Sequence, residues 1–567
     1  MAMDRSHHLP ASQFAVQLVG PSKLTLNRAK TVAPPGPQQI VARVEAVGLC
    51  FSDLKLLKQF TDHVRKGEVV RGLPADVLAE IPSYVPNEKP TVPGHEAVCR
   101  IVAAGREVKH HKVGERVLIQ TDYRDLRTAQ SNAAFGYNFE GALQEYVLMD
   151  ERVIMEPGTG LRFLIPVSDH LGASAVALVE PWACVEDSYV TVERQTIRAG
   201  GKLLVVADVG RQVKGLAGAL AKEGGPAGVT AICAETSQRQ AVAAIGAPVL
   251  DVASVAALGG AAFDDIIYFG ADAKTIEALN DLLGTRGVMN IVTGGRKIGR
   301  PVSVGVGRVH YGMTRWIGTT GEDASVSYRS IPRTGEVRPG DRVVVIGAGG
   351  PMGQMHVIRN VCSGVEGVSI VASDVDDGRL EALLHKAGPM AQARGVSLST
   401  ANPTRETSSD TFSYIALMAP VPALLAGAIR SSADGALINV FAGIPAATRH
   451  ELDLDAYVER RCYMFGTSGS SIRDMEIVLG KLRGGSLDTD CSVDAVSGMA
   501  GALEGLAAVE NRTLAGKIIV YPELHDLGLT PLSQLPARFP SVAAKLKGGF
   551  WCKAAEEELL KVAGGGR

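Results

Sequence analysis

The spacing of hydrophobic residues along the chain changes near residue 190. Before that point, short β-branched runs are broken by Gly and Pro, which predicts a β-rich region. After it, continuous apolar runs are typical of strands buried on both faces of a parallel sheet. The strands expected on the two sides are 40–47, 97–103 and 116–119, then 202–207, 229–233, 265–269 and 287–292, with a helix at 213–221.

The buried-strand pattern then starts again, with strands expected at 342–346, 368–372, 414–418 and 436–441 and a helix at 354–361. Segments of the two stretches match in order: 197–203 with 337–343, 290–295 with 439–443, and 316–321 with 464–469. Ser188–Tyr189 and Ser327–Tyr328 precede the two stretches at nearly the same distance. A spacing of about 140–150 residues indicates a duplicated domain, and chance similarity of two α/β domains is the alternative. A strand at 516–522 and a helix at 553–562 follow.

Size and charge narrow the class of protein. The 567 residues are too many for one domain. The formal net charge of −2 favours neither a nucleic acid nor an anionic membrane as partner. Residues 1–13 are polar, no stretch reaches the ~18 apolar residues of a membrane span, and eight scattered cysteines predict free thiols. We therefore expect a cytoplasmic protein.

Four residues form a candidate metal constellation in the β-rich region and just after it: Cys50, His95, Glu96 and Glu180. Each is weak evidence alone, because a histidine in such a triplet is more often structural. Together they offer one thiolate, one imidazole and two carboxylates, a suitable set for a catalytic Zn²⁺ with an exchangeable position. Zinc lowers the pKa of a bound alcohol and makes an alkoxide accessible near neutral pH.

The order of these residues, with Ser52 and Asp53 after Cys50, resembles the zinc-containing medium-chain alcohol dehydrogenases, most of all the sorbitol, threonine and sugar dehydrogenase branch. The resemblance implies that Cys50 and His95 are direct ligands and that Glu96 and Glu180 are carboxylate ligands. It also implies that Ser52 passes the substrate proton outward and that Asp53 orients a ligand. Many members of that family hold a second, structural zinc on a lobe with four closely spaced cysteines. No cysteine lies in 120–138 of this chain, so the resemblance implies one catalytic zinc and no structural zinc.

The expected fold is α/β, with a GroES-like β-rich catalytic domain and two tandem Rossmann-type, doubly wound parallel-sheet domains. The expected boundaries are 1–190 for the catalytic domain, completed by 470–525, then 195–325 for a degenerate Rossmann-like domain, 336–469 for the NAD-binding domain and 526–567 for an extension.

A glycine-rich loop lies between a buried strand and a helix in the second copy, where a dinucleotide fingerprint is expected. Its candidate cofactor residues are Gly347, Gly349, Gly350, Pro351, Met352 and Gly353. Asp374, about 20 residues on, favours NAD by accepting hydrogen bonds from ribose hydroxyls, whereas the nearby Arg379 keeps NADP open. The first copy has Asp208 and few glycines at this place, although Glu235 preserves the acid. We hypothesise that this copy takes the place of a partner subunit within one chain.

The resulting prediction is a zinc-dependent oxidoreductase that moves hydride between NAD and a polyol or sugar-type secondary alcohol, possibly phosphorylated. The alternatives are an isomerase or lyase that recycles a tightly bound NAD, and a non-catalytic metal and nucleotide sensor. A small-molecule substrate is the expected partner, and a homodimer or homotetramer is open. Conceivable pocket contacts in the long segment 59–89 are Arg65, Arg71 and Tyr84; Arg308, Arg315 and Arg329 are interpreted as surface charges, with phosphate binding as the alternative.

Overall fold

The computed structural model describes residues 9–405 and 409–564. Parts of three expected domains fall outside these ranges: residues 1–8, 406–408 and 565–567. The chain forms two compact units, the first made of 1–186 with 469–567 and the second of 187–468. No helix among the described residues is both long and apolar enough to cross a membrane.

The first unit is built on an eight-stranded sheet with the order β10-β6-β5-β3-β26-β25-β27, in which β9 also pairs with β3. The expected strands before residue 190 and near the C-terminus are confirmed. The bounds are β3 (Gln39–Gly48), β5 (Glu96–Ala104), β6 (Arg116–Ile119), β9 (Tyr146–Asp150), β10 (Leu164–Pro166), β25 (Val493–Ser497), β26 (Lys517–Val520) and β27 (Thr530–Pro531).

Two smaller sheets complete the strands of this unit. One is the hairpin β1 (Ser12–Gly20) and β2 (Lys23–Thr31). The other has the order β4-β7-β8, with β4 (Val69–Arg71), β7 (Asp122–Thr128) and β8 (Asn132–Ala134). The second sheet joins the long segment 59–89 to the cysteine-free segment 120–138.

Helices of the first unit come from both ends of the chain. They include α1 (Phe51–Gln59), α2 (Ala75–Ala79), α3 (Ala173–Ala177), the start of α4 (Val179–Val190), α13 (Ile472–Arg483), α14 (Ala502–Asn511), α15 (Leu535–Arg538), α16 (Pro540–Ala543) and α17 (Lys553–Ala563). The Glu556 carboxylate on α17 accepts the Ala173 and Ser174 amides at 2.6 and 2.7 Å, where the N-terminus of α3 needs acceptors. This contact fixes the predicted C-terminal helix to the unit.

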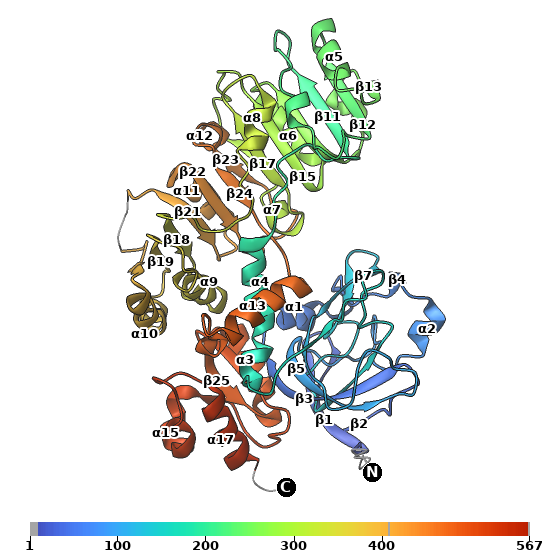
Figure 1. Cartoon of the computed structure of the whole chain (residues 1–567), viewed down its shortest axis with the longest axis vertical. Coiled ribbons are helices and arrows are strands. Elements are labelled where there is room, and N and C mark those ends of the chain that lie inside the picture. The colour runs from blue at the N-terminus through green and yellow to red at the C-terminus, as the bar shows by residue number, and fades with distance from the viewer. Residues whose placement is uncertain (1–8, 406–408, 565–567) are drawn as a thin grey trace. The chain divides into compact units, whose positions relative to one another are not determined.

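The second unit contains one twelve-stranded sheet, visible as the row of strands from β13 to β19 in Figure 1. Its first half has the order β13-β12-β11-β14-β15-β17, and its second half has the order β24-β22-β21-β18-β19-β20. Numbered along the chain, both halves follow 3-2-1-4-5-6, the order of a doubly wound sheet. The bounds are β11 (Lys202–Ala207), β12 (Gly228–Cys233), β13 (Val249–Asp251), β14 (Phe263–Phe269), β15 (Leu283–Val292), β17 (Arg315–Thr319), β18 (Arg342–Ile346), β19 (Ser369–Ser373), β20 (Ser397–Ala401), β21 (Phe412–Leu417), β22 (Ser432–Val440) and β24 (Tyr463–Phe465).

The two halves meet through their corresponding strands. β17 and β24, each the sixth strand of its half, pair antiparallel at Trp316 and Met464. β16 (Val302–Val304) and β23 (His450–Leu452) pair antiparallel as well. We call this junction the seam. Antiparallel pairing of equivalent strands relates the halves by an approximate two-fold axis, as in a symmetric dimer interface.

A buried ion pair lies at the seam. Arg315 on β17 donates to both oxygens of Glu193 at 2.8 and 2.9 Å, and the Tyr463 hydroxyl on β24 donates to the same carboxylate at 2.6 Å. Both members of the pair have only 6% of their side-chain surface exposed. The surface interpretation of Arg315 is therefore wrong, because an acid from outside the local sequence neutralises it.

Helices cover the sheet of the second unit, with one exception in its first half. They are α5 (Thr236–Ala243), α6 (Ala273–Leu282), α7 (Gly307–Tyr311), α8 (Ala324–Arg329), α9 (Pro351–Val361), α10 (Asp377–Arg394), α11 (Pro422–Arg430) and α12 (Leu454–Glu459). The helix expected at 213–221 is wrong, since only the short 3₁₀ turn η2 (Ala217–Ala219) forms there. Gly215 adopts φ +83° against Asp323, and a Cβ there would lie 1.9 Å from the Asp323 Oδ1 atom. The preceding residue, Lys214, forms a parallel bridge with Asp323, and a left-handed glycine beside a bridged residue does not continue a helix.

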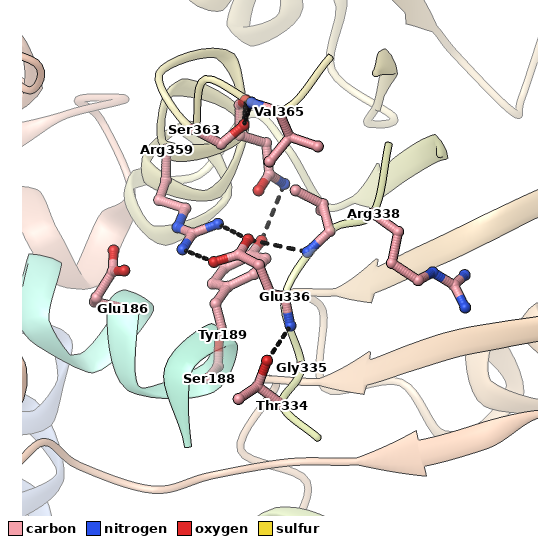
Figure 2. A network of polar contacts seen from close by, with 12 residues as sticks. Glu186, Ser188, Tyr189, Thr334, Gly335, Glu336, Arg338, Arg359, Ser363 and Val365 are labelled. Carbon is pink, nitrogen blue, oxygen red and sulfur yellow. Dashed lines mark hydrogen bonds and ion pairs between the residues drawn. The ribbon is translucent and has the colours of Figure 1, made fainter. Parts of the chain in front are cut away.

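The two Ser-Tyr pairs pack on opposite halves. Tyr189, at the end of α4, stacks on Tyr414 of the second half, and its hydroxyl lies 2.8 Å from His356 Nδ1. Figure 2 shows Arg359 against Tyr189, with its guanidinium bound to Glu336. Tyr328 on α8 instead donates to Asp265 of the first half at 2.8 Å. Each pair thus precedes one half in sequence and packs on the other.

Candidate metal centre and nucleotide crevice

Asp53 organises the start of α1 at the metal constellation. Cys50 is the N-cap of this helix, and its amide donates to Asp53 Oδ2 at 3.1 Å. The other oxygen, Oδ1, lies 3.0 Å from His95 Nδ1 and accepts the Gly94 amide at 3.3 Å. Burial opposes ionisation of His95, but the Asp53 carboxylate raises the pKa of His95 well above its usual range. Asp53 therefore leaves His95 Nε2 directed at the cluster, in the orienting role expected for it.

Three of the four proposed ligands lie together. Ligand atoms of Cys50, His95 and Glu96 are all within 4.8 Å of one another, and His95 and Glu96 are buried. The Ser52 hydroxyl donates to Cys50 Sγ at 3.0 Å and lies 3.0 Å from His95 Nε2. The cluster thus combines a thiol, an imidazole and a carboxylate next to a hydroxyl.

Glu96 is held by a lysine that sequence reasoning missed. Lys517, on β26, donates to Glu96 Oε1 at 2.6 Å and to the Leu49 carbonyl at 2.8 Å. The second carboxylate oxygen, Oε2, is buried, and no described residue gives it a hydrogen bond. A buried carboxylate oxygen without a hydrogen-bond donor can bind a cation instead, so the three residues fit a zinc ion.

Glu180 lies near this cluster but is not one of the three clustered residues. It occupies the first turn of α4 and is 7% exposed. Burial raises the pKa of Glu180 to about 7 against the opposing charge of His95, and the Glu96 and Asp122 carboxylates raise it further. These interactions put the Glu180 carboxylate within electrostatic range of the cluster.

A second group of side chains lies beside the cluster and comes from the two segments joined by the β4-β7-β8 sheet. The Tyr137 ring lies 5.9 Å from the His95 ring and 5.0 Å from the His63 ring. Arg65 forms an ion pair with Asp122 at 2.5 Å. Of the pocket contacts named from sequence, Arg65 lies in this group. Arg71 is exposed, and the Tyr84 hydroxyl accepts the Val69 amide at 2.7 Å.

The candidate cofactor residues come together at the carboxyl end of β18. Gly347 adopts φ +85°, which favours glycine. Gly350 is the N-cap of α9, Pro351 is its first residue and Met352 follows. A Cβ on Gly353 would lie 2.2 Å from the Gly347 carbonyl oxygen, so this glycine lets α9 approach the loop closely. A helix N-terminus behind a glycine turn is a ready site for a pyrophosphate.

The acid that follows β19 borders the same loop. Asp374 Oδ2 accepts the Gly349 amide at 2.8 Å. Arg379 lies there too, since a Cβ on Gly349 would be 2.7 Å from the Arg379 Cβ atom. All eight candidate cofactor residues thus surround one loop of the second unit.

Side chains occupy the corresponding place in the first half. The Tyr268 hydroxyl donates to both Asp208 oxygens at 2.9 and 3.0 Å, and the Arg211 guanidinium donates to the Val292 carbonyl at 3.4 Å. Gln238 donates to the carbonyls of Asp208 and Arg211, both at 2.9 Å. These contacts close the carboxyl ends of β11, β14 and β15 with the protein's own groups.

Comparison with known proteins places an alcohol dehydrogenase GroES-like domain at residues 36–158. This segment contains Cys50, His95 and Glu96. The chain is 30% identical over 154 residues to D-xylulose reductase of Morganella morganii, an alignment that spans 26% of this chain and 38% of that protein. The chain therefore covers about two fifths of that relative's length.

Two other similarities extend further along the chain. It is 25% identical over 353 residues to the protein YggP of Escherichia coli, covering 56% of this chain and 81% of YggP. The solved structure of 2R,3R-butanediol dehydrogenase from Bacillus subtilis aligns with a TM-score of 0.51 and 14% identity, over 90% of this chain and all of that one. At this identity the structural match concerns the fold alone. The chain is an α/β protein with similarity to alcohol and polyol dehydrogenases.

Proposed function

We propose that the protein is a zinc-dependent oxidoreductase that transfers hydride between NAD and a polyol or sugar-type secondary alcohol. The observation that carries the proposal is the cluster of Cys50, His95 and Glu96 with Ser52 in hydrogen-bond contact. A sensor site needs ligands alone, whereas a dehydrogenase also needs a group that moves the alcohol proton. The hydroxyl beside the cluster favours turnover.

Each residue has a distinct role in this proposal. Cys50, His95 and Glu96 would hold Zn²⁺, and Glu180 would act as a carboxylate ligand that exchanges with water. A bound zinc ion supplies the positive charge that lowers the pKa of the substrate alcohol. Ser52 would take the proton from that alcohol and pass it outward, and Asp53 and Lys517 keep two ligands in place.

The second half of the twelve-stranded sheet would bind the cofactor. Its loop offers backbone amides, a helix N-terminus and three closely packed glycines to a pyrophosphate. Asp374 would accept hydrogen bonds from the ribose hydroxyls, which favours NAD over NADP.

The first half would have a structural role as a duplicated, degenerate Rossmann domain. It lacks the helix that would face a pyrophosphate, and Asp208 and Arg211 fill the crevice. Its pairing across the seam supports the hypothesis that it replaces the partner subunit of a symmetric dimer. Residues 1–190 and 470–525 would form the catalytic domain.

The test is NADH formation by zinc-loaded protein over a panel of polyols, sugars and their phosphates. Cys50→Ala and His95→Ala are expected to lower turnover by at least about a hundredfold and to reduce bound zinc, because each removes a direct ligand. Cys552→Ala, which removes another thiol of the same unit, is the matched control and is expected to keep both.

Two results would contradict the proposal. Absence of net NADH from every panel member, with zinc present and NAD retained after purification, would favour the isomerase or lyase alternative. A protein that binds its ligands equally well after zinc removal, without turnover, would favour the sensor alternative.

A further inference from the structure

A single arginine from the long segment 59–89 lies beside the metal cluster. Arg65 follows the 3₁₀ turn η1 (Phe60–Asp62), and its amide donates to His63 Nδ1 at 3.2 Å. The guanidinium carbon lies 5.6 Å from the centre of the Tyr137 ring, in cation–π range. The backbone turn and the aromatic face therefore hold the arginine in one orientation.

The Arg65 guanidinium is only partly used by the protein. Its ion pair with Asp122 involves Nη1, and a guanidinium has five N–H donors. Among the described residues, Asp122 is the carboxylate that forms an ion pair with Arg65. The Arg65 side chain keeps 26% of its surface exposed, against 8% for Asp122. The arginine side chain is thus half-buried, while the acid that holds it is buried.

Electrostatic interactions link Arg65 to the metal cluster through Tyr137 and Glu180. Burial raises the pKa of Tyr137, and the surrounding charges that act on it are His95, Arg65, Asp53 and Cys50. Arg65 also interacts with Glu180, which in turn interacts with His95 and Glu96. The Arg65 guanidinium carbon and the His95 ring lie 5.6 and 5.9 Å from the same Tyr137 ring, so the arginine is close to the cluster.

Asp122 is fixed from a distant part of the sequence. A Cβ on Gly469 would lie 2.8 Å from Asp122 Oδ2. The next carbonyl, that of Ser470, accepts Gln120 at 3.2 Å and Arg124 at 2.7 Å. The start of the C-terminal segment of the first unit thus lies against the acid and keeps the ion pair in place.

We infer that Arg65 binds the oxygen-rich end of the substrate, away from the carbon that gives up hydride. This inference rests on the proposed function and adds a residue that selects substrates by their distal oxygen atoms. The ligand chemistry is a set of oxygen acceptors, offered either by the hydroxyls of a polyol or by a phosphate ester at its end. A guanidinium recognises such acceptors through paired N–H donors, which a lysine cannot reproduce. Asp122 is a positioning residue that acts through Arg65.

The experiment compares Arg65→Met with Arg71→Met, its exposed neighbour in the same segment, as the matched control. The substrates are butan-2-ol, sorbitol and sorbitol 6-phosphate. Arg65→Met is expected to lower kcat/KM by about 10–100-fold on the substrates with distal oxygens, mainly through KM, and by less than about threefold on butan-2-ol. Arg65→Lys is expected to restore only part of the loss. Arg71→Met is expected to behave as the wild type.

The relative losses identify the source of the oxygen atoms. A larger loss on sorbitol 6-phosphate indicates a phosphate at the far end, and a larger loss on sorbitol indicates hydroxyls. Equal losses on all three substrates, or none, would overturn the inference, because a merely structural arginine does not discriminate by substrate length.

Calorimetric binding of sorbitol and of sorbitol 6-phosphate to zinc-loaded protein provides a readout that does not depend on turnover. If the wild type binds one of them and Arg65→Met binds it at least about tenfold more weakly, the role of Arg65 stands even where no alcohol is oxidised and the proposed function fails. If the wild type binds neither probe, or the variant binds as well as the wild type, the inference is wrong.

Discussion

The two halves of the twelve-stranded sheet share one strand order and differ at the place where a nucleotide would bind. In the second half, a glycine loop leads into α9, and Gly349 donates to Asp374. In the first half, Gly210 donates in the same way to Glu235 at 2.6 Å, but no helix follows. The sheet and the acid are alike in the two halves, whereas the loop is not. Apolar strands buried on both faces therefore specify this fold without help from the binding loop.

The difference also shows what a binding crevice requires besides a sheet. Asp208 stands where the second half has Gly347, directly after the first strand of each half. Its carboxylate binds Tyr268, and the neighbouring Arg211 bonds to carbonyls at the ends of the strands. Polar groups that would otherwise face a cofactor satisfy one another, which stabilises the half without any ligand.

The largest expected effect is a loss of stability on breaking the buried ion pair at the seam. Arg315→Met leaves Glu193 buried without its cation, and breaking such a pair costs about 3–5 kcal/mol. The measurement is the free energy of unfolding from urea titration. Burial raises the pKa of Glu193, but the Arg315 charge holds this pKa below its usual range. The ion pair therefore stabilises the folded state above the ordinary carboxyl pKa, and this stabilisation is lost as the pH falls through the lowered pKa. The variant should therefore lose part of the wild type's acid sensitivity.

The double variant Glu193→Gln with Arg315→Met is the control, because it removes both charges together. It is expected to unfold at a higher urea concentration than Arg315→Met alone. If the single variant were as stable as the wild type, the seam would not depend on this pair.

A reciprocal exchange tests which half binds the nucleotide. Gly347→Asp puts a charged side chain at φ +85° beside the proposed pyrophosphate site and is expected to weaken NADH binding by about a hundredfold or more. Asp208→Gly in the first half is expected to change it by less than about twofold. Fluorescence titration measures both. Equal losses, or a loss only in Asp208→Gly, would reverse the assignment of the halves.

A smaller effect on cofactor affinity is expected from the acid that follows the second strand of each half. Asp374→Asn removes a charge that would accept ribose hydroxyls and is expected to weaken NAD binding by about tenfold and to narrow the preference over NADP. Glu235→Gln, at the same place in the first half, is the matched control and should leave both affinities unchanged. A weaker preference for NAD in Glu235→Gln would show that the first half also takes part in binding.

The strands were readily predicted from sequence because a continuous apolar run has few alternatives to a buried strand. The segment 202–207 coincides with β11 and 342–346 with β18. The helix at 213–221 was wrongly predicted for a reason that is not local: Gly215 lies against Asp323, and Lys214 pairs with the same residue, more than a hundred positions away. Arg315 likewise received its partner Glu193 only through folding.

The candidate site was partly accessible to sequence reasoning. Cys50, Ser52, His95 and Glu96 stand in a recognisable order, and the structure brings them together. The roles of Lys517 and Asp122 were missed because nothing in the local sequence marks their side chains as site residues. Only the three-dimensional packing brings them to Glu96 and Arg65. Spacing alone gave no argument for Arg65.

The segments that lead into and out of the first half lie next to each other. Val192 and Thr334 form an antiparallel bridge, and the Glu193 amide donates to the Arg333 carbonyl at 2.9 Å. The first half is thus an insertion in the sequence between α4 and β18. Deleting the first half would remove β17, the antiparallel partner of β24, and would leave β24 as an unpaired edge strand. If the first half takes the place of a partner subunit, as we hypothesise, a second copy of the shortened chain is expected to pair with this strand in its stead.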